Sequence, residues 1–304
     1  MTIEQWAKDL AQITSPENIK LHESLKKYTM TKLGGKADVF VMPETEEEAE
    51  GIVKYTYENQ VPLLLLGNGS NMVVRDGGVR GIVMNFSKLN EIRVEGDQIY
   101  AQSGALIIDV SKKAAEESLT GFEFACGIPG SVGGAMAMNA GAYGGEINDV
   151  IVHSVVLTRE GERLVLTKEE LELGYRKSII AKKGYLVLSS LFQLSKGDKK
   201  AIDEKIADLT FQRESKQPLE YPSAGSVFKR PPGYFAGKLI QDSGLQGKGV
   251  GGAEVSTKHA GFIINKGNAT ASDYIQTIEM VQRVVKEKFG VDLELEVKIV
   301  GEDL

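Results

Sequence analysis

A serine and two cations stand close together in the segment "SAGSVFKRP" (223–231). Ser226 follows a glycine and precedes the pair Lys229 and Arg230, so its hydroxyl would lie where a negatively charged ligand can dock. Such a hydroxyl can attack a carbonyl group or donate a proton. The sequence argues against a serine hydrolase, because no G-x-S-x-G motif surrounds any serine and only three histidines are available as a base.

A glycine-rich loop, "GNGSN", follows the apolar run "PLLLL" (62–66) directly. A buried strand that opens into such a loop can turn several backbone N–H groups toward one point and form a nest for phosphate oxygens. Taken alone, the loop is more simply a tight turn without a ligand. Together with the second loop described next, it predicts a site for the pyrophosphate of a dinucleotide cofactor. The candidate ligands are Gly67, Asn68, Gly69, Ser70 and Asn71.

A second glycine-rich loop lies between Gly121 and Gly145, a stretch that holds eight of the 34 glycines. It leads into a helix of small residues, which suits close approach of the backbone to a flat ligand. The alternative is a tightly packed helix crossing. The candidate cofactor-binding residues here are Gly127, Pro129, Gly130, Ser131, Gly133, Gly134, Asn139 and Gly141.

Neither loop has a known dinucleotide or nucleotide fingerprint. Met72 stands where the third glycine of a Rossmann G-x-G-x-x-G motif is required, and no G-x-x-x-x-G-K-[ST] motif occurs. We therefore predict a nucleotide-type cofactor on another scaffold.

The elements that must position these residues mix helices with several kinds of sheet. Residues 37–66 read as one β-α-β unit, and the alternating runs of 80–105 predict antiparallel strands with a turn at Gly96-Asp97. Further strands are expected within 150–193 and at 260–265 and 292–300, and further helices at 106–118, 198–216, 234–244 and 272–289. The predicted class is α+β, with segregated helices and mixed sheets.

Composition limits the possible partners. A net charge of −6 over 304 residues gives no electrostatic reason to bind nucleic acid or anionic lipid. The single cysteine, Cys126, excludes an internal disulfide and a multi-cysteine metal site. No signal peptide is visible, and no apolar run reaches the roughly 20 residues that span a bilayer. We expect a monomeric cytoplasmic protein without a metal site.

Several motifs together resemble known flavoproteins. The segments "KLGGKADVF", "GNGSNMVVRDGG" and "GFEFACGIPGSVGGAMAMNAGAYGGEI" resemble the FAD-binding domain of the vanillyl-alcohol-oxidase type. With "GYRKS", "AGSVFKRP", "VSTKHAGFIINKGNATASD" and "LELEVKIVG" added, the chain resembles the UDP-N-acetylenolpyruvoylglucosamine reductase (MurB) family, in its shorter form without an extra tyrosine-bearing loop.

The resemblance implies a domain plan. Residues 1–218 would form the FAD-binding domain, in two α+β parts of about 1–67 and 68–218. Residues 219–304 would form a smaller α+β substrate domain, with a terminal strand at about 292–300 returning to the FAD domain.

The resemblance also implies an activity. NADPH would reduce non-covalent FAD, which would reduce the enolpyruvyl ether of UDP-N-acetylglucosamine to UDP-N-acetylmuramate for peptidoglycan synthesis. Ser226 would donate a proton to the substrate carbon, while Arg176 and Glu296 would hold or polarise its carboxylate. The residues implied to contact the UDP-sugar are Tyr175, Lys216, Arg230 and His259.

Two alternatives remain open. Another FAD-dependent oxidoreductase or oxidase would share the glycine-rich loops without needing Ser226, Arg176 and Glu296. A non-catalytic nucleotide-sugar-binding protein would keep the fold and lack the flavin.

Overall fold

The computed structural model describes all 304 residues. The chain forms two compact units that are interleaved along the sequence. Unit 1 comprises Met1–Leu21, Asp38–Asn68 and Gly81–Arg213, and unit 2 comprises His22–Ala37, Gly69–Arg80 and Glu214–Leu304. The sequence predicted a single domain boundary after residue 218. That the FAD-binding domain precedes this boundary and the substrate domain follows it stays a prediction. Both units combine helices and strands, and the predicted α+β class is confirmed.

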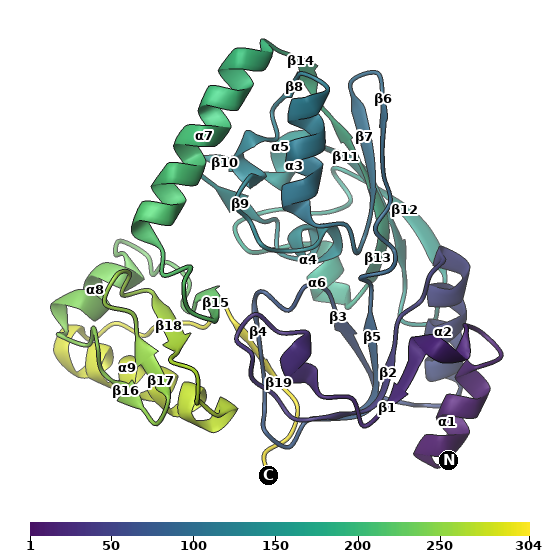
Figure 1. The fold of residues 1–304 in the computed structure, drawn as a ribbon, viewed down its shortest axis with the longest axis horizontal. Helices are drawn as coiled ribbons and strands as arrows, with labels where there is room; N and C mark the ends of the chain where they lie inside the picture. The colour runs from purple at the N-terminus through teal and green to yellow at the C-terminus, as the bar shows by residue number, and fades with distance from the viewer. The chain divides into compact units, whose positions relative to one another are not determined.

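Unit 1 is the larger of the two and contains two main sheets (Figure 1). Its helices are α1 (Ile3–Leu10), α2 (Glu46–Glu58), α3 (Ile107–Glu116), α4 (Val132–Ala137), α5 (Ile147–Val150), α6 (Ile179–Lys183) and α7 (Lys199–Lys216), with the short turns η1 (Pro16–Asn18) and η3 (Glu123–Ala125). The last three residues of α7 belong to unit 2. The strands of the first sheet, in spatial order, are β1 (Ile19–Leu21), β2 (Ala37–Val41), β5 (Val79–Asn85) and β3 (Leu63–Leu66).

The first sheet corrects one expectation. The alternating runs of 80–105 predicted antiparallel strands, yet β5 pairs in parallel with β3, with Leu63 opposite Ile82 and Leu66 opposite Asn85. It lies between β2 and β3, so the predicted β-α-β unit has a later strand inserted at its centre. Six of the seven β5 residues are buried, including all five from Gly81 onward, which a central strand requires and an alternating edge strand does not.

The second sheet is antiparallel throughout, which the sequence predicted for its two strands within residues 80–105. Its strands in spatial order are β12 (Arg163–Thr167), β11 (Ile151–Leu157), β13 (Leu186–Gln193), β7 (Gln98–Gln102) and β6 (Ile92–Glu95). The turn between β6 and β7 contains Gly96 at φ +66°, a left-handed conformation that favours glycine. Four short strands complete unit 1: β8 (Leu119–Thr120), β9 (Gly141–Ala142), β10 (Gly145–Glu146) and β14 (Ser195–Lys196).

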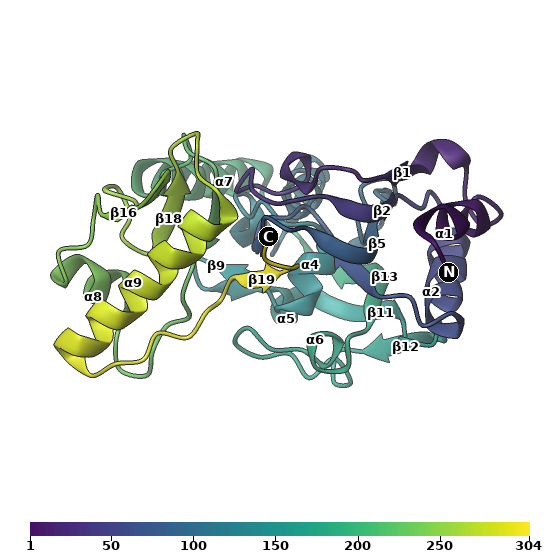
Figure 2. The ribbon, with the colours of Figure 1, turned by 90° about the horizontal axis from the view of Figure 1, so that it is seen from below.

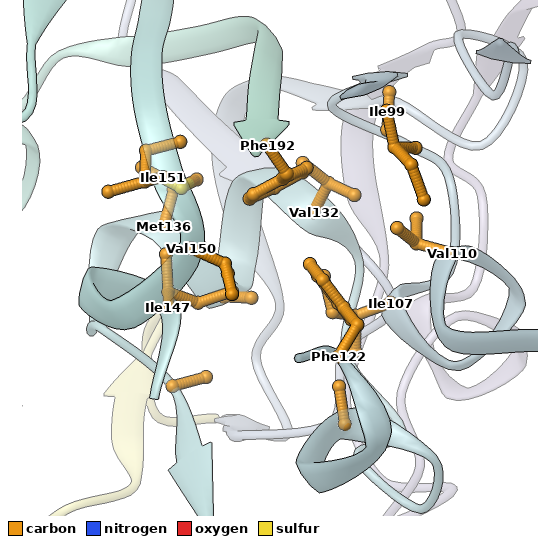
Figure 3. Packing of buried hydrophobic residues seen from close by; sticks show 14 of the residues in the cluster. Ile99, Ile107, Val110, Phe122, Val132, Met136, Ile147, Val150, Ile151 and Phe192 are labelled. Atoms are coloured by element: carbon orange, nitrogen blue, oxygen red, sulfur yellow. The ribbon is translucent and has the colours of Figure 1, made fainter. Parts of the chain in front are cut away.

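The core beside this sheet fixes the second glycine-rich loop. Val132 and Met136 of α4 are fully buried, and Figure 3 shows them among the apolar side chains of the same cluster. Phe122 and Phe192 meet edge to face there, with ring centroids 5.1 Å apart. Because the helix that follows the loop is embedded in this packing, the loop backbone is held in a defined position.

Unit 2 is built around a four-stranded antiparallel sheet and one long helix. Its strands in spatial order are β15 (Ser223–Ser226), β18 (Phe262–Asn265), β17 (Ala253–Val255) and β16 (Gly249–Val250). Its helices are η2 (Leu25–Lys27), α8 (Ala236–Asp242) and α9 (Ala271–Phe289). Figure 2 shows α9 running along this sheet, and Tyr274, Ile278, Val281 and Val285 on its apolar face are all buried.

The terminal strand is shorter than the sequence predicted. Regular pairing is limited to β19 (Lys298–Val300), which lies parallel to β4 (Met72–Val74) within unit 2. Upstream of this strand, Leu293 and Val297 are buried. The backbone of residues 294–297 hydrogen-bonds to residues 227 and 229 and forms no continuous strand ladder, so the regular strand begins only at Lys298.

No helix of either unit combines the length and the apolar composition that a membrane crossing requires.

Asp76 holds the amino-terminal end of α9. Its carboxylate accepts hydrogen bonds from the backbone N–H groups of Ala271 and Ser272, each at 2.9 Å, and from Ser272 Oγ at 2.8 Å. Although burial alone would raise it, these hydrogen bonds hold the pKa of the Asp76 carboxyl below its usual value. The negative charge also complements the helix dipole.

We expect Asp76→Asn to lower the free energy of unfolding by about 1–3 kcal/mol at pH 7, because a charge-assisted acceptor is lost. A carboxyl with a lowered folded-state pKa stabilises above its unfolded pKa and loses that effect as the pH falls through the folded value. Urea titrations at pH 7 and at about pH 3 should therefore show the difference shrinking in acid. Asp242→Asn, at an exposed carboxylate of α8, is the matched control. Equal effects of the two variants would contradict the role of Asp76.

Candidate active site

The first glycine-rich loop presents backbone donors that nothing in the chain uses. The N–H groups of Gly67, Asn68, Gly69 and Ser70 donate to no acceptor of the protein. Gly69 has φ +59°, and a Cβ there would lie 2.1 Å from the carbonyl oxygen of Tyr28, so only glycine fits. Successive unused N–H groups around a left-handed residue suit a phosphate, so the loop fits an anionic cofactor.

The two predicted loops meet within unit 1. Asn68 Nδ2 donates to the carbonyl oxygen of Pro129 at 2.6 Å. A Cβ on Gly67 would lie 2.5 Å from Ser131 Oγ, so the absence of a side chain permits this approach. The structure therefore brings members of the first and second candidate sets side by side.

The N–H groups at the start of α4 are already used. Val132 N donates to Ala105 O at 2.8 Å and Gly133 N to Ser103 O at 2.9 Å, while Gly134 N reaches Ser131 Oγ at 3.4 Å. A Cβ on Gly133 would lie 2.1 Å from Ser103 Oγ. Gly133 thus allows close internal packing, and its predicted contact with a cofactor, like those of Gly127, Gly130, Gly134 and Gly141, stays a prediction.

Asn139 positions another predicted residue. Its side chain is buried and both of its polar atoms are hydrogen-bonded, with Oδ1 accepting from Asn148 N at 2.9 Å and Nδ2 donating to Gly174 O at 3.2 Å. Gly174 opens the turn that carries Arg176 and closes on Lys177 through two backbone hydrogen bonds. Asn139 therefore fixes the turn of Arg176, a role that the sequence did not indicate.

Arg176 is held in an unusual backbone conformation. Its φ is +54°, which is costly for a residue with a side chain and is therefore maintained by the surrounding structure. The guanidinium lies 5.2 Å from the ring centroid of the exposed Tyr175. Ser178, just after the turn, donates from Oγ to Ala137 O at 2.6 Å. The end of α4 thus anchors both sides of the turn.

Unit 2 brings together Ser226, Glu296 and Asn71, which lie far apart in the sequence. Glu296 N donates to the carbonyl oxygen of Val227 at 2.8 Å, directly beside Ser226. The carbonyl oxygen of Glu296 accepts from Asn71 Nδ2 at 3.1 Å, and Asn71 O accepts from Lys298 N at 3.1 Å. Ser226 ends β15 with its side chain exposed. Two predicted catalytic residues and one predicted cofactor-binding residue therefore share one hydrogen-bonded frame.

The predicted substrate-binding residues of unit 2 have different environments. Lys216 is exposed at the end of α7, and the exposed Arg230 places its guanidinium 4.0 Å from the ring centroid of Phe235. His259 is half-buried, and burial lowers the pKa of its imidazole. Its Nδ1 accepts from Gly261 N at 3.1 Å, so the neutral ring carries its proton on Nε2.

Sequence reasoning missed Asn85. Its buried side-chain Nδ2 donates to the carbonyl oxygens of Leu66 and Gly67, each at 3.0 Å, and so fixes the start of the first glycine-rich loop. An asparagine at the end of an apolar strand carries no signal of this role until the parallel pairing of β3 and β5 is known.

Comparisons with known proteins agree with this arrangement. The family model of the UDP-N-acetylenolpyruvoylglucosamine reductase C-terminal domain matches residues 217–300, and that of the FAD binding domain matches residues 37–167. The UDP-N-acetylenolpyruvoylglucosamine reductase of Geobacillus thermodenitrificans (strain NG80-2) is 64% identical over 294 residues and is covered to 97%, as is this chain. That of Geobacillus kaustophilus (strain HTA426) is 63% identical, with 99% of each chain covered.

A solved structure supports the same conclusion. The crystal structure of UDP-N-acetylenolpyruvylglucosamine reductase (MurB) from Thermus caldophilus superposes with a TM-score of 0.79 at 35% identity. The match covers 93% of this chain and 98% of that one. The chain therefore belongs to the UDP-N-acetylenolpyruvoylglucosamine reductase family and carries an FAD-binding domain.

Proposed function

We propose that this protein uses NADPH and FAD to reduce the enolpyruvyl ether of a UDP-N-acetylglucosamine substrate to UDP-N-acetylmuramate in peptidoglycan synthesis. Membership of the reductase family supports the reaction class. The observation that carries the assignment of residues is the frame of unit 2, in which the backbone of Glu296 bonds beside Ser226. We also propose a monomer acting in the cytoplasm.

Bound FAD would supply the chemistry of hydride transfer from NADPH to the substrate alkene. We propose that the unused N–H groups of Gly67, Asn68, Gly69 and Ser70 bind its pyrophosphate. Four oriented amides suit a protein whose net charge is −6, because they attract an anion without a basic surface. The second glycine-rich loop would contribute Pro129, Gly130 and Ser131, next to Asn68.

Ser226 is proposed to donate the proton that completes the reduction. Hydride addition to one carbon of an enol ether conjugated to a carboxylate leaves carbanion character on the neighbouring carbon. A serine hydroxyl is a weak acid toward most groups, but a carbanion is basic enough to take its proton. The exposed position of Ser226 at the end of β15 leaves its hydroxyl accessible to a ligand.

Arg176 and Glu296 are proposed to act on the substrate carboxylate. As hydride arrives, that carboxylate gains enolate character and therefore more negative charge. The guanidinium of Arg176 would stabilise this charge, and a preorganised donor of this kind contributes about 10²- to 10³-fold. The carboxyl group of Glu296 would polarise the same group, and in its protonated form it would donate a hydrogen bond.

Lys216, Arg230, Tyr175 and His259 are proposed to bind the UDP-sugar. The two cations suit a diphosphate. Because burial keeps His259 neutral at pH 7, we expect it to offer a hydrogen bond from Nε2 rather than a charge.

We expect Ser226→Ala to keep its flavin and to be reduced by NADPH at the normal rate, because the hydroxyl acts only in the second half-reaction. Transfer to the enolpyruvyl UDP-sugar should fall by about 10²- to 10⁴-fold, the range of a positioned proton donor. Anaerobic stopped-flow absorbance separates the two half-reactions. Ser223→Ala, in the same strand, is the control and should leave both unchanged. Wild-type transfer by Ser226→Ala would remove the hydroxyl from the mechanism.

We expect Glu296→Ala to lower kcat at least 10-fold while changing the substrate Kd less, because its interaction strengthens as the enolate forms. Glu296→Gln, which keeps a hydrogen-bond donor, should retain more activity than Glu296→Ala. Steady-state kinetics and equilibrium titration with the UDP-sugar give the two quantities. A weaker Kd with an unchanged kcat would instead make Glu296 a binding residue only.

A further inference from the structure

Arg213 lies against the second glycine-rich loop within unit 1. A Cβ on Gly127 would stand 2.5 Å from Arg213 Cδ and 3.2 Å from Nε, so the arginine stem packs directly on the glycine backbone. Two contacts with Cys126, one and two helical turns before Arg213, fix this face of α7 against the loop. Thr210 Oγ1 lies 3.9 Å from Cys126 Sγ, and that sulfur lies 4.0 Å from Ile206 O. The guanidinium is therefore held beside residues 126–127 and is not free to sample solvent at random.

No carboxylate accompanies this cation. Arg213 makes no hydrogen bond and no ion pair within the chain, whereas Arg93 and Arg163 of the same unit pair with glutamates. Its electrostatic neighbours are Tyr143 and Cys126. Burial raises the pKa of both the Cys126 thiol and the Tyr143 hydroxyl, so both groups are neutral at pH 7.

A partly buried cation without a counter-ion is unfavourable. Removing a charge from water costs free energy that an opposite charge must offset, and a chain that folds around such a group normally supplies one. Burial also lowers the pKa of the Arg213 guanidinium, which has the same physical cause. No carboxylate of the chain pairs with Arg213, but the neighbouring loop is part of the proposed cofactor site.

We infer that Arg213 is a cofactor-binding residue whose guanidinium is the counter-ion of an anionic group of bound FAD, beside Gly127. The inference rests on the proposed use of FAD and adds a residue to that site. The group is either the diphosphate, which is charged in both redox states, or the ring of the reduced flavin, which gains negative charge on reduction. In either case the positive charge is required by the ligand and not by the fold.

The test compares Arg213→Met, Arg213→Lys and the wild type after removal of flavin from the full-length protein. Fluorescence titration of each apoprotein with FAD and with riboflavin gives the affinities, and spectroelectrochemistry of the reconstituted proteins gives the midpoint potentials. We expect Arg213→Met to weaken FAD binding about 10- to 100-fold if the diphosphate is the partner, with riboflavin unaffected. If the reduced ring is the partner, the potential falls instead. Arg213→Lys should lie closer to the wild type.

The thermal stability of the apoproteins separates a ligand role from a structural one. Because the cation lacks a counter-ion in the chain, the apoprotein of Arg213→Met should unfold at the same or a higher temperature than the wild type. Arg93→Met, which removes the same charge from a paired site in unit 1, is the matched control for affinity. Wild-type FAD affinity and potential in Arg213→Met would overturn the inference, as would a lower unfolding temperature of its apoprotein. Failure of the wild-type apoprotein to bind FAD would instead contradict the proposed function.

Discussion

The backbone hydrogen bonds of residues 294–298 are the constraint on which the candidate site of unit 2 depends. Glu296 N and Lys229 N tie this segment to the chain around Val227, while Asn71 and Lys298 tie it to the first glycine-rich loop. Main-chain bonds of this kind fix position more tightly than flexible side chains do, because few rotatable bonds separate the anchored atoms. These hydrogen bonds therefore hold the backbone at Glu296 next to that at Ser226, although 70 positions separate the two residues in the sequence.

An acidic chain can bind anionic ligands without a basic surface when a few hydrogen-bond donors all point toward the ligand. The unused amides from Gly67 to Ser70 would attract phosphate without any net positive charge, and they would lose little entropy on binding because Gly69 is already held against Tyr28. Individual cations then act locally. Arg176 is positioned by Asn139 through Gly174, and Arg213 is positioned by its packing on Gly127.

Sequence reasoning predicted the features that local patterns encode. The turn at Gly96, the helix α9 and the strand–loop transition after Leu66 follow from period and turn chemistry, and all are present. Patterns of this kind do not encode which strands pair. The parallel partner of β5 and the interleaving of the two units depend on contacts between distant segments, so the direction of β5 and the length of the terminal strand were predicted wrongly.

The candidate site residues divide into the same two groups. Ser226, Arg176 and Glu296 were identified by resemblance to a family, since a serine, an arginine and a glutamate on their own carry no chemical signal. Asn85, Asn139 in its positioning role and Arg213 emerged only from three-dimensional contacts.

The proposed flavin-dependent reduction is tested most directly by the absorption spectrum of the purified protein under anaerobic conditions. NADPH should bleach a flavin band, and the enolpyruvyl UDP-sugar should restore it. A protein that stays colourless after incubation with FAD, or a bleached flavin that only oxygen reoxidises, would contradict the proposed reaction.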